Sequence, residues 1–385
     1  MNNEQRAAAQ CLIRVISSVI RGESLTSLPE GVSFSSLREQ AEANDLTAMA
    51  FEGIQDILPG EEIAQWTDQN NIELVLDINQ QEAYEEVIRI LTGHGIRILP
   101  LKGIALKESY PCSWYRHMAD LDFLIDVDRD KDVRDLLVQN GYEVDTFRSG
   151  HDDQYVKEPY IYLEMHISMA GSTIPKISKY YDDPWSRAVP TERPLVYAFN
   201  WNDYYIYMIA HMAKHYYSGG MGIRFLLDVY MFLKSHEKDL DREYVARELR
   251  KMELEGFCSD MEEIAEHWFG DSSAGAASEL RAMEDFILEY GTFGEPNQSI
   301  RGLMGQTAGT DGNSNGSRLR YVMRRLFPDL RYMRERYRFL FKAPALLPAA
   351  YIMRIFSTVR DPEAIGRINN EIDVMQEDAE DQYEG

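Results

Sequence analysis

The segment that most limits the fold is a short apolar run with two carboxylates, RHMADLDFLID, at residues 116–126. Alternate side chains of a strand share a face, so Asp120 and Asp122 point to one side while Leu121 and Phe123 point to the other. The apolar side needs a core to pack against. On the polar side, two like charges are costly to bury unless positive charge meets them. We therefore expect a sheet with one covered face and a polar site at its edge.

Short strand-like runs alternate with helical patterns around this segment. The expected strands lie near 96–101, 120–127, 142–147 and 160–168, and the expected helices at 104–109 and 129–139. Before residue 90 and after residue 195, apolar residues recur at three- and four-residue spacing, as in YYIYMIAHMAKHYY, which predicts helices. The predicted fold class is α+β, with a mixed β-sheet core flanked by helical regions at both ends.

These patterns divide the chain into four parts. We predict an N-terminal helical region at 1–90, an α/β core at 91–195, a C-terminal helical domain at 196–360 and an acidic tail at 361–385. The tail from residue 371 has no Lys or Arg, a composition typical of disorder. The Gly- and Ser-rich stretch 302–317 reads as a loop and lacks the GK[ST] ending of a P-loop.

Composition indicates a cytoplasmic protein. No apolar run approaches the roughly 18–20 residues that span a bilayer. Cys11, Cys112 and Cys258 show neither a disulfide framework nor zinc-site spacing. A formal net charge of −24 argues against general coating of nucleic acid, although it leaves a local anion site open.

A second strand repeats the alternation of the first. In IYLEMHIS, Glu164 and His166 share one face and Leu163 and Met165 share the other. If the two strands meet in one sheet, three carboxylates and an imidazole gather at one edge. Hard oxygen ligands suit Mg²⁺, and Mn²⁺ is the alternative, so the sequence predicts a site for one or two divalent cations. His166 is expected either to orient the carboxylates or to take part directly.

The turn upstream offers donors for an anion. In ILPLKGIALKESY a strand runs into Lys102-Gly103 and then into a helix, which places a lysine and backbone amides at one end of the sheet. Arg116 precedes the Asp pair closely enough to reach the same phosphates with its fork of donors. An ordinary ion pair between Arg116 and Asp120 is the alternative.

Three other features have simpler explanations. His211 and His215 have metal-compatible spacing, but the aromatic helix around them favours packing, with one of them lining a cleft as the alternative. Arg224 and Asp228 have the spacing of an ion pair on one helix face. The arginine-rich stretch 318–342 could contact nucleic acid or an anionic membrane surface, yet its Leu, Phe and Tyr residues favour a packed helix.

These motifs also carry a resemblance. The set LPLKGIAL, YRHMADLDFLID and YIYLEMHISM resembles the bacterial family labelled uncharacterised nucleotidyltransferase, within the polymerase-beta-like nucleotidyltransferase superfamily. The similarity runs from about residue 90 to 356 and is weakest in the N-terminal helices. It implies transfer of a nucleoside monophosphate from an NTP such as ATP to a hydroxyl acceptor.

The resemblance also implies roles for residues. Asp120 and Asp122 would bind the metals, and Glu164 would ligate a metal or activate the acceptor hydroxyl. The wider superfamily has Gly-Gly or Gly-Ser after the first strand, whereas this chain has Lys102-Gly103-Ile104, so a phosphate-binding hydroxyl is missing. Two further hypotheses stay open: a non-catalytic nucleotide-binding regulatory module, and a toxin-like enzyme that modifies tRNA or protein.

Overall fold

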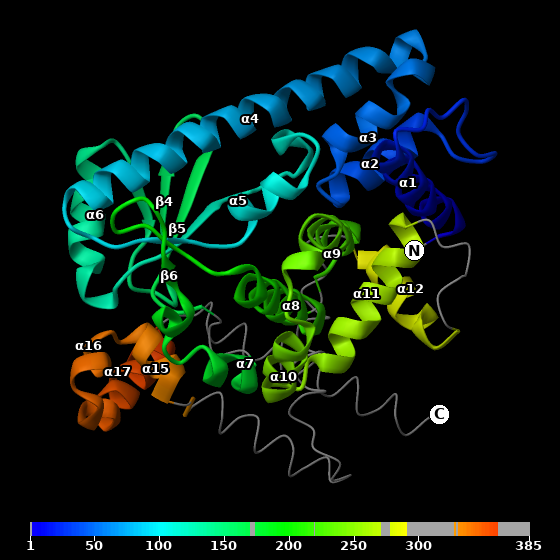
Figure 1. Cartoon of the computed structure of the whole chain (residues 1–385). Coiled ribbons are helices and arrows are strands. Elements are labelled where there is room, and N and C mark those ends of the chain that lie inside the picture. The colour runs from blue at the N-terminus through cyan, green and yellow to red at the C-terminus, as the bar shows by residue number, and fades with distance from the viewer. Residues whose placement is uncertain are drawn as a thin grey trace.

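The computed structural model describes residues 2–169, 174–218, 220–270, 278–290, 327–328 and 330–360. The strands of its main sheet are β1 (Leu99–Pro100), β2 (Leu121–Leu124), β3 (Glu143–Thr146), β4 (Asp152–Lys157) and β5 (Ile161–His166). They lie in the order β1-β2-β5-β4-β3, with β2 and β5 parallel and the other neighbours antiparallel. A mixed sheet surrounded by helices confirms the predicted α+β class (Figure 1).

One face of the sheet is covered as its alternating pattern predicts. Phe123 of β2 and Met165 of β5 are fully buried in an apolar cluster with Val87. Val87 belongs to α4 (Gly60–Gly93), the long helix that crosses the sheet in Figure 1, and α6 (Asp130–Gln139) packs beside it. Because the apolar side chains of both strands turn toward α4, the alternate positions are left for the polar site.

Strand β4 was not predicted. This strand begins with Asp152, Asp153 and Gln154, which lack the apolar alternation that predicts a strand. It nevertheless pairs with both β5 and β3. Its first carboxylates have side-chain partners: Gln154 donates to Asp152, and the fully buried Asp153 accepts hydrogen bonds from Arg338. The pattern was hidden because the partner of Asp153 is 185 residues away in the chain.

Helices form both flanks, as predicted. In addition to α4 and α6 they are α1 (Asn3–Arg21), α2 (Phe34–Ala43), α3 (Thr47–Ile54), α7 (Pro175–Tyr180), α8 (Trp201–Tyr217), α9 (Ile223–His236), α10 (Arg242–Met252), α11 (Glu255–Phe269) and α12 (Arg281–Tyr290). The large apolar core joins α1 and α3 to α8, α9 and α11. A small two-stranded sheet, β6 (Val189–Pro190) with β7 (Tyr197–Ala198), precedes α8. The four domain boundaries stay a prediction.

The helix predicted at 104–109 is shorter than expected. The chain forms α5 (Gly103–Leu106), only four residues long, and continues as a 3₁₀ turn over Lys107–Ser109. The ammonium group of Lys107 is buried against Asp77 of α4. This contact fixes the turn from outside, so the segment needs little helix propensity of its own.

The C-terminal helices lie beside the sheet. They are α15 (Leu330–Arg336), α16 (Phe339–Lys342) and α17 (Leu347–Arg360), and Figure 1 places them near α6. In the described part of the stretch 318–342, Arg331 pairs with Asp182 and Arg338 with Asp153, which fits a packed segment. The predicted loop 302–317 and the tail 361–385 lie outside the described residues. Among the residues that are described, no helix is both long and apolar enough to cross a membrane.

Candidate active site

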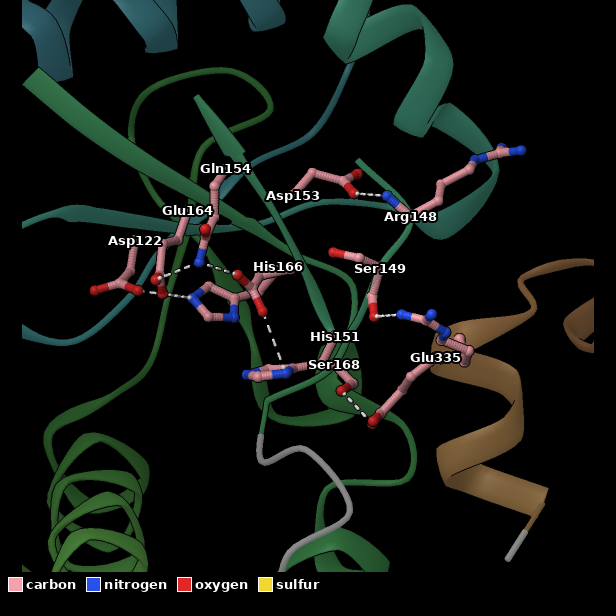
Figure 2. Close-up of polar contacts among 12 residues, drawn as sticks. Asp122, Arg148, Ser149, His151, Asp153, Gln154, Glu164, His166, Ser168 and Glu335 are labelled. Carbon is pink, nitrogen blue, oxygen red and sulfur yellow. Dashed lines mark hydrogen bonds and ion pairs between the residues drawn. The ribbon is translucent and has the colours of Figure 1, made fainter. Parts of the chain in front are cut away.

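The sheet brings the predicted carboxylates together. Asp122 of β2 lies directly beside Glu164 of β5, and His166 follows two residues later on the same face. The Nε2 atom of His166 is 2.7 Å from Oδ1 of Asp122 and 3.2 Å from Oε2 of Glu164 (Figure 2). We call Asp120, Asp122, Glu164 and His166 the carboxylate cup. Residues separated by up to 46 positions thus form one polar site at the place that the alternation predicted.

Lys102 supplies a positive charge to this cup. It lies in the turn between β1 and α5, and its Nζ is 2.6 Å from Oδ1 of Asp122 and 3.5 Å from Oε2 of Glu164. Its backbone φ is 51°, an unusual conformation for a residue other than glycine, and the Tyr204 hydroxyl donates a 2.6 Å hydrogen bond to its carbonyl. Burial opposes its charge, yet the carboxylates of Asp122 and Asp120 hold the pKa of Lys102 well above its usual value.

Burial and charge act differently on the cup's titratable groups. Burial, together with the charge of Asp122, raises the pKa of Asp120 to about 6. Burial disfavours the charged imidazole of His166, but its hydrogen bonds to Asp122 and Glu164 raise its pKa to about 9. For Glu164, burial is outweighed by His166 and Lys102, which hold its pKa well below the usual range. When all are ionised, three carboxylates face two cations, so one negative charge is in excess.

This donor set fits a divalent cation. One ligand atom each from Asp122, Glu164 and His166 lies within 4.8 Å of the others. The predicted metal ligands were Asp120, Asp122 and Glu164. Among the described residues, His166 rather than Asp120 completes this trio, because its Nε2 lies 2.7 Å from Asp122 and 3.2 Å from Glu164. Asp120, the fourth member of the cup, lies outside this trio and lines the adjoining cavity.

A cavity of about 170 Å³ opens beside the cup. Its floor includes Lys102, Gly103, Asp120 and Asp122, and its roof comes from α8 and α9. The roof residues are mostly aromatic or imidazole side chains: Tyr204, Tyr207, His211, His215 and Phe225. The cavity therefore has a charged floor, and its roof of aromatic, imidazole and methionine side chains also includes Arg224 and Asp228.

Both histidines of α8 line this cavity, whereas the predicted alternative to packing placed one of them at a cleft, and both rings also pack against Phe225. Their Nε2 atoms are 3.1 Å apart. Burial, assisted by nearby positive charges, lowers the pKa of His215 to about 3 and holds that of His211 well below its usual value. Both rings are therefore neutral near pH 7. Periodicity alone could not show that both lie at the cavity, because that depends on how α8 packs in the folded chain.

Arg116 lines the same cavity but already has a carboxylate partner. Its Nε and Nη2 each donate a 2.9 Å hydrogen bond to the carboxylate of Asp228, which also accepts one from the Tyr110 hydroxyl. The alternative pair with Asp120 is not the one that forms. Gly103 leaves room for this guanidinium, because a Cβ atom at position 103 would overlap Nη1 of Arg116 and Sδ of Met118. The group that lies close to the backbone at Gly103 is therefore the guanidinium of Arg116.

The predicted ion pair between Arg224 and Asp228 is wrong. Arg224 instead donates to the carbonyl of His117 at 2.8 Å and lies 3.4 Å from Asp45. Asp228 is occupied by Arg116, from a segment 112 residues earlier. The four-residue spacing of Arg224 and Asp228 could not show that Arg116 binds Asp228 instead.

Three polar residues near the cup were not predicted. Gln154 of β4 donates hydrogen bonds to Glu164 at 3.3 Å and to Asp152 at 2.9 Å, and His151 lies 3.2 Å from Asp152. They were missed together with β4. The sequence signal that could have found them is the polar cluster HDDQ immediately before an alternating run.

The mixed sheet with flanking helices and paired carboxylates at its edge fits a nucleotidyltransferase-like α+β fold. The model of the family described as uncharacterised nucleotidyltransferase matches residues 30–270. The chain therefore belongs to this family. The family model begins and ends earlier in the chain than the resemblance described from the sequence motifs, which ran from about residue 90 to 356. The family model therefore includes N-terminal helices in which that resemblance was weakest. Searches of curated proteins and of solved structures gave no match.

Proposed function

We propose that the protein is a Mg²⁺-dependent nucleotidyltransferase that moves a nucleoside monophosphate from an NTP to a hydroxyl acceptor, with Mn²⁺ as the alternative ion. The observation that carries the proposal is the pairing of Asp122 with Glu164 on adjacent parallel strands, with Lys102 on both carboxylates. The excess negative charge of the cup and the cavity beside it support a cation and an anionic substrate there. Family membership supports the same class of reaction.

The residues take the following roles in this proposal. Asp122, Glu164 and Asp120 hold the divalent cation, and His166 orients Asp122 and Glu164 through its Nε2 contacts. A divalent cation held by these residues would stabilise the negative charge on the attacking and leaving oxygens. Lys102, the amide of Gly103 and the guanidinium of Arg116 bind the triphosphate. The acceptor enters between the sheet and α8.

Turnover of NTP tests the assignment. Purified protein is incubated with each labelled NTP, Mg²⁺ or Mn²⁺ and a panel of hydroxyl acceptors, and pyrophosphate is measured. We expect Asp122→Asn to lower turnover at least about tenfold, because a ligand is lost. Asp145→Asn, on the exposed strand β3, is the matched control. Equal pyrophosphate release by wild type and Asp122→Asn removes the support for catalysis.

A second experiment identifies the acceptor. Labelled NTP is added to a cell lysate with the protein, and RNA, protein and small molecules are separated. The fraction that is labelled by the wild type and not by Asp122→Asn contains the acceptor. An unlabelled RNA fraction removes the tRNA version of the toxin-like hypothesis, against which the pairing of Arg331 and Arg338 with carboxylates already argues.

One observation favours a non-catalytic nucleotide-binding module instead. Two of the predicted phosphate ligands, Lys102 and Arg116, have carboxylate partners within the chain, and Ile104 stands where a serine is expected. Calorimetry with a non-hydrolysable NTP separates the two functions. Metal-dependent binding without turnover in any acceptor assay supports the module.

A further inference from the structure

A second cluster of ligand-type side chains lies behind the carboxylate cup. It consists of His151, Asp152 and His166, whose ligand atoms lie within 4.8 Å of one another. Asp152 is the cross-strand neighbour of His166, and His151 places its Nδ1 atom 3.2 Å from Oδ1 of Asp152. Figure 2 shows His151 on the opposite side of the His166 ring from Asp122. His166 therefore stands between two groups of ligands.

The ring of His166 has one satisfied nitrogen and one unsatisfied nitrogen. Nε2 faces the carboxylates of Asp122 and Glu164 and carries the proton that they accept. Nδ1 is buried and has no hydrogen-bond partner among the described residues, and the residue as a whole is only 4% exposed. A buried polar atom without a partner costs free energy, so this nitrogen indicates a ligand that the protein itself does not supply.

The surroundings of this nitrogen define the chemistry of that ligand. The ligand atoms of His151 and Asp152, a second imidazole and a carboxylate, lie within 4.8 Å of a ring nitrogen of His166, and the three together form a mixed nitrogen and oxygen donor set. Such sets suit Zn²⁺, and Co²⁺ as its usual substitute, better than Mg²⁺. A histidine whose other nitrogen donates to a carboxylate is also the usual form of a metal-bound imidazole, because the carboxylate fixes the ligating tautomer.

We propose that His151, Asp152 and His166 form a transition-metal site, of the Zn²⁺ class, that shares the His166 ring with the carboxylate cup. Binding at Nδ1 displaces any proton there, so one metal ion enters and that proton leaves to solvent. The metal links β4 and β5 to Asp122 through a single ring. It needs no nucleotide, so the site stands or falls independently of the proposed function.

Metal titration of the full-length protein tests the site. Protein is first stripped of metal with a chelator and then titrated with Co²⁺. Excess Mg²⁺ is present to occupy oxygen-rich sites. Visible absorption and bound metal are measured, and Zn²⁺ is then added as competitor. We expect about one equivalent of Co²⁺, displaced by Zn²⁺, for the wild type. His151→Ala and Asp152→Asn should each weaken binding at least about tenfold.

Two further variants sharpen the result. His94→Ala removes an exposed histidine at the end of α4 and should bind Co²⁺ as the wild type does. Lys214→Gln removes a positive charge of α8 that acts on His151, so it should bind Co²⁺ more tightly. Circular dichroism in chelator confirms that each variant is folded, and His151→Gln replaces His151→Ala if the latter is not. No uptake by the wild type, or equal uptake by wild type and His151→Ala, overturns the proposal.

Discussion

Replacement of Arg338 gives the sharpest test of how the C-terminal helices are held. Its side chain is 4% exposed, and its guanidinium donates hydrogen bonds of 2.6 Å to Asp130 and of 2.7 Å to both oxygens of Asp153. Breaking a buried ion pair by removing one partner costs about 3–5 kcal/mol, because the other charge stays buried. Arg338→Met has similar length and no charge, so it isolates this effect.

The expected cost lies at the lower end of that range. After the substitution Asp130 keeps its two hydrogen bonds from Arg148, and Asp153 keeps the backbone amide of Arg148 at 2.7 Å. Burial also raises the pKa of Asp153, in spite of Arg338, so this carboxyl can take up a proton once its partner is gone. We therefore expect a loss of about 3 kcal/mol in the free energy of unfolding.

Urea unfolding at neutral pH, followed by tryptophan fluorescence and circular dichroism, measures this loss. Arg331→Met is the matched control, because Arg331 pairs with Asp182, whose side chain is 62% exposed, and such surface pairs contribute about 0–1 kcal/mol. The unfolding midpoint should fall much further for Arg338→Met than for Arg331→Met. Equal shifts for the two variants would refute the claim that the buried pair anchors the helices.

Three further predictions concern the cup and its turn. In Gly103→Ala the new Cβ would displace Arg116. We expect the free energy of unfolding, measured by urea titration, to fall by about 1–3 kcal/mol. We also expect weaker NTP binding, measured by calorimetry. Because Asp120 has a pKa of about 6, Mg²⁺ affinity measured by calorimetry should rise as pH increases through 6, and Asp120→Asn should flatten that dependence. The pKa of His166 is about 9 in the folded protein, above its unfolded value near 6.5. The contribution of His166 to stability is therefore complete below about pH 6.5 and is lost as pH rises through 9. Over this interval the unfolding midpoint should fall more for wild type than for His166→Gln.

The sequence could predict the parts of the site that depend on local alternation. Glu164 and His166 share a face with Asp122 because β2 and β5 alternate cleanly and run side by side. The turn that carries Lys102 followed from a strand that ends at Lys102-Gly103. To predict these features it is enough to know that side chains alternate along a strand and that the two strands are paired. The apolar pattern of the sequence indicates both.

What the sequence could not predict depends on partners far away in the chain. Arg116 meets Asp228 from α9, and Asp153 meets Arg338, through buried ion pairs whose two halves look like ordinary surface charges in sequence. For the same reason β4 was missed, since its polar start is neutralised by a distant arginine. His211 became a cavity residue only through the docking of α8 over the sheet.

The position of Lys102 gives the site its most consequential constraint. Holding a non-glycine residue at a φ of 51° costs about 1–3 kcal/mol, and the hydrogen bond from Tyr204 helps to maintain it. The strained turn directs the ammonium group onto Asp122 and Glu164, where it neutralises part of their charge. In the proposed function a divalent cation would take over that neutralisation and leave Lys102 available to a phosphate. Cation and NTP should then bind with positive coupling, and by reciprocity each should raise the affinity for the other by the same factor.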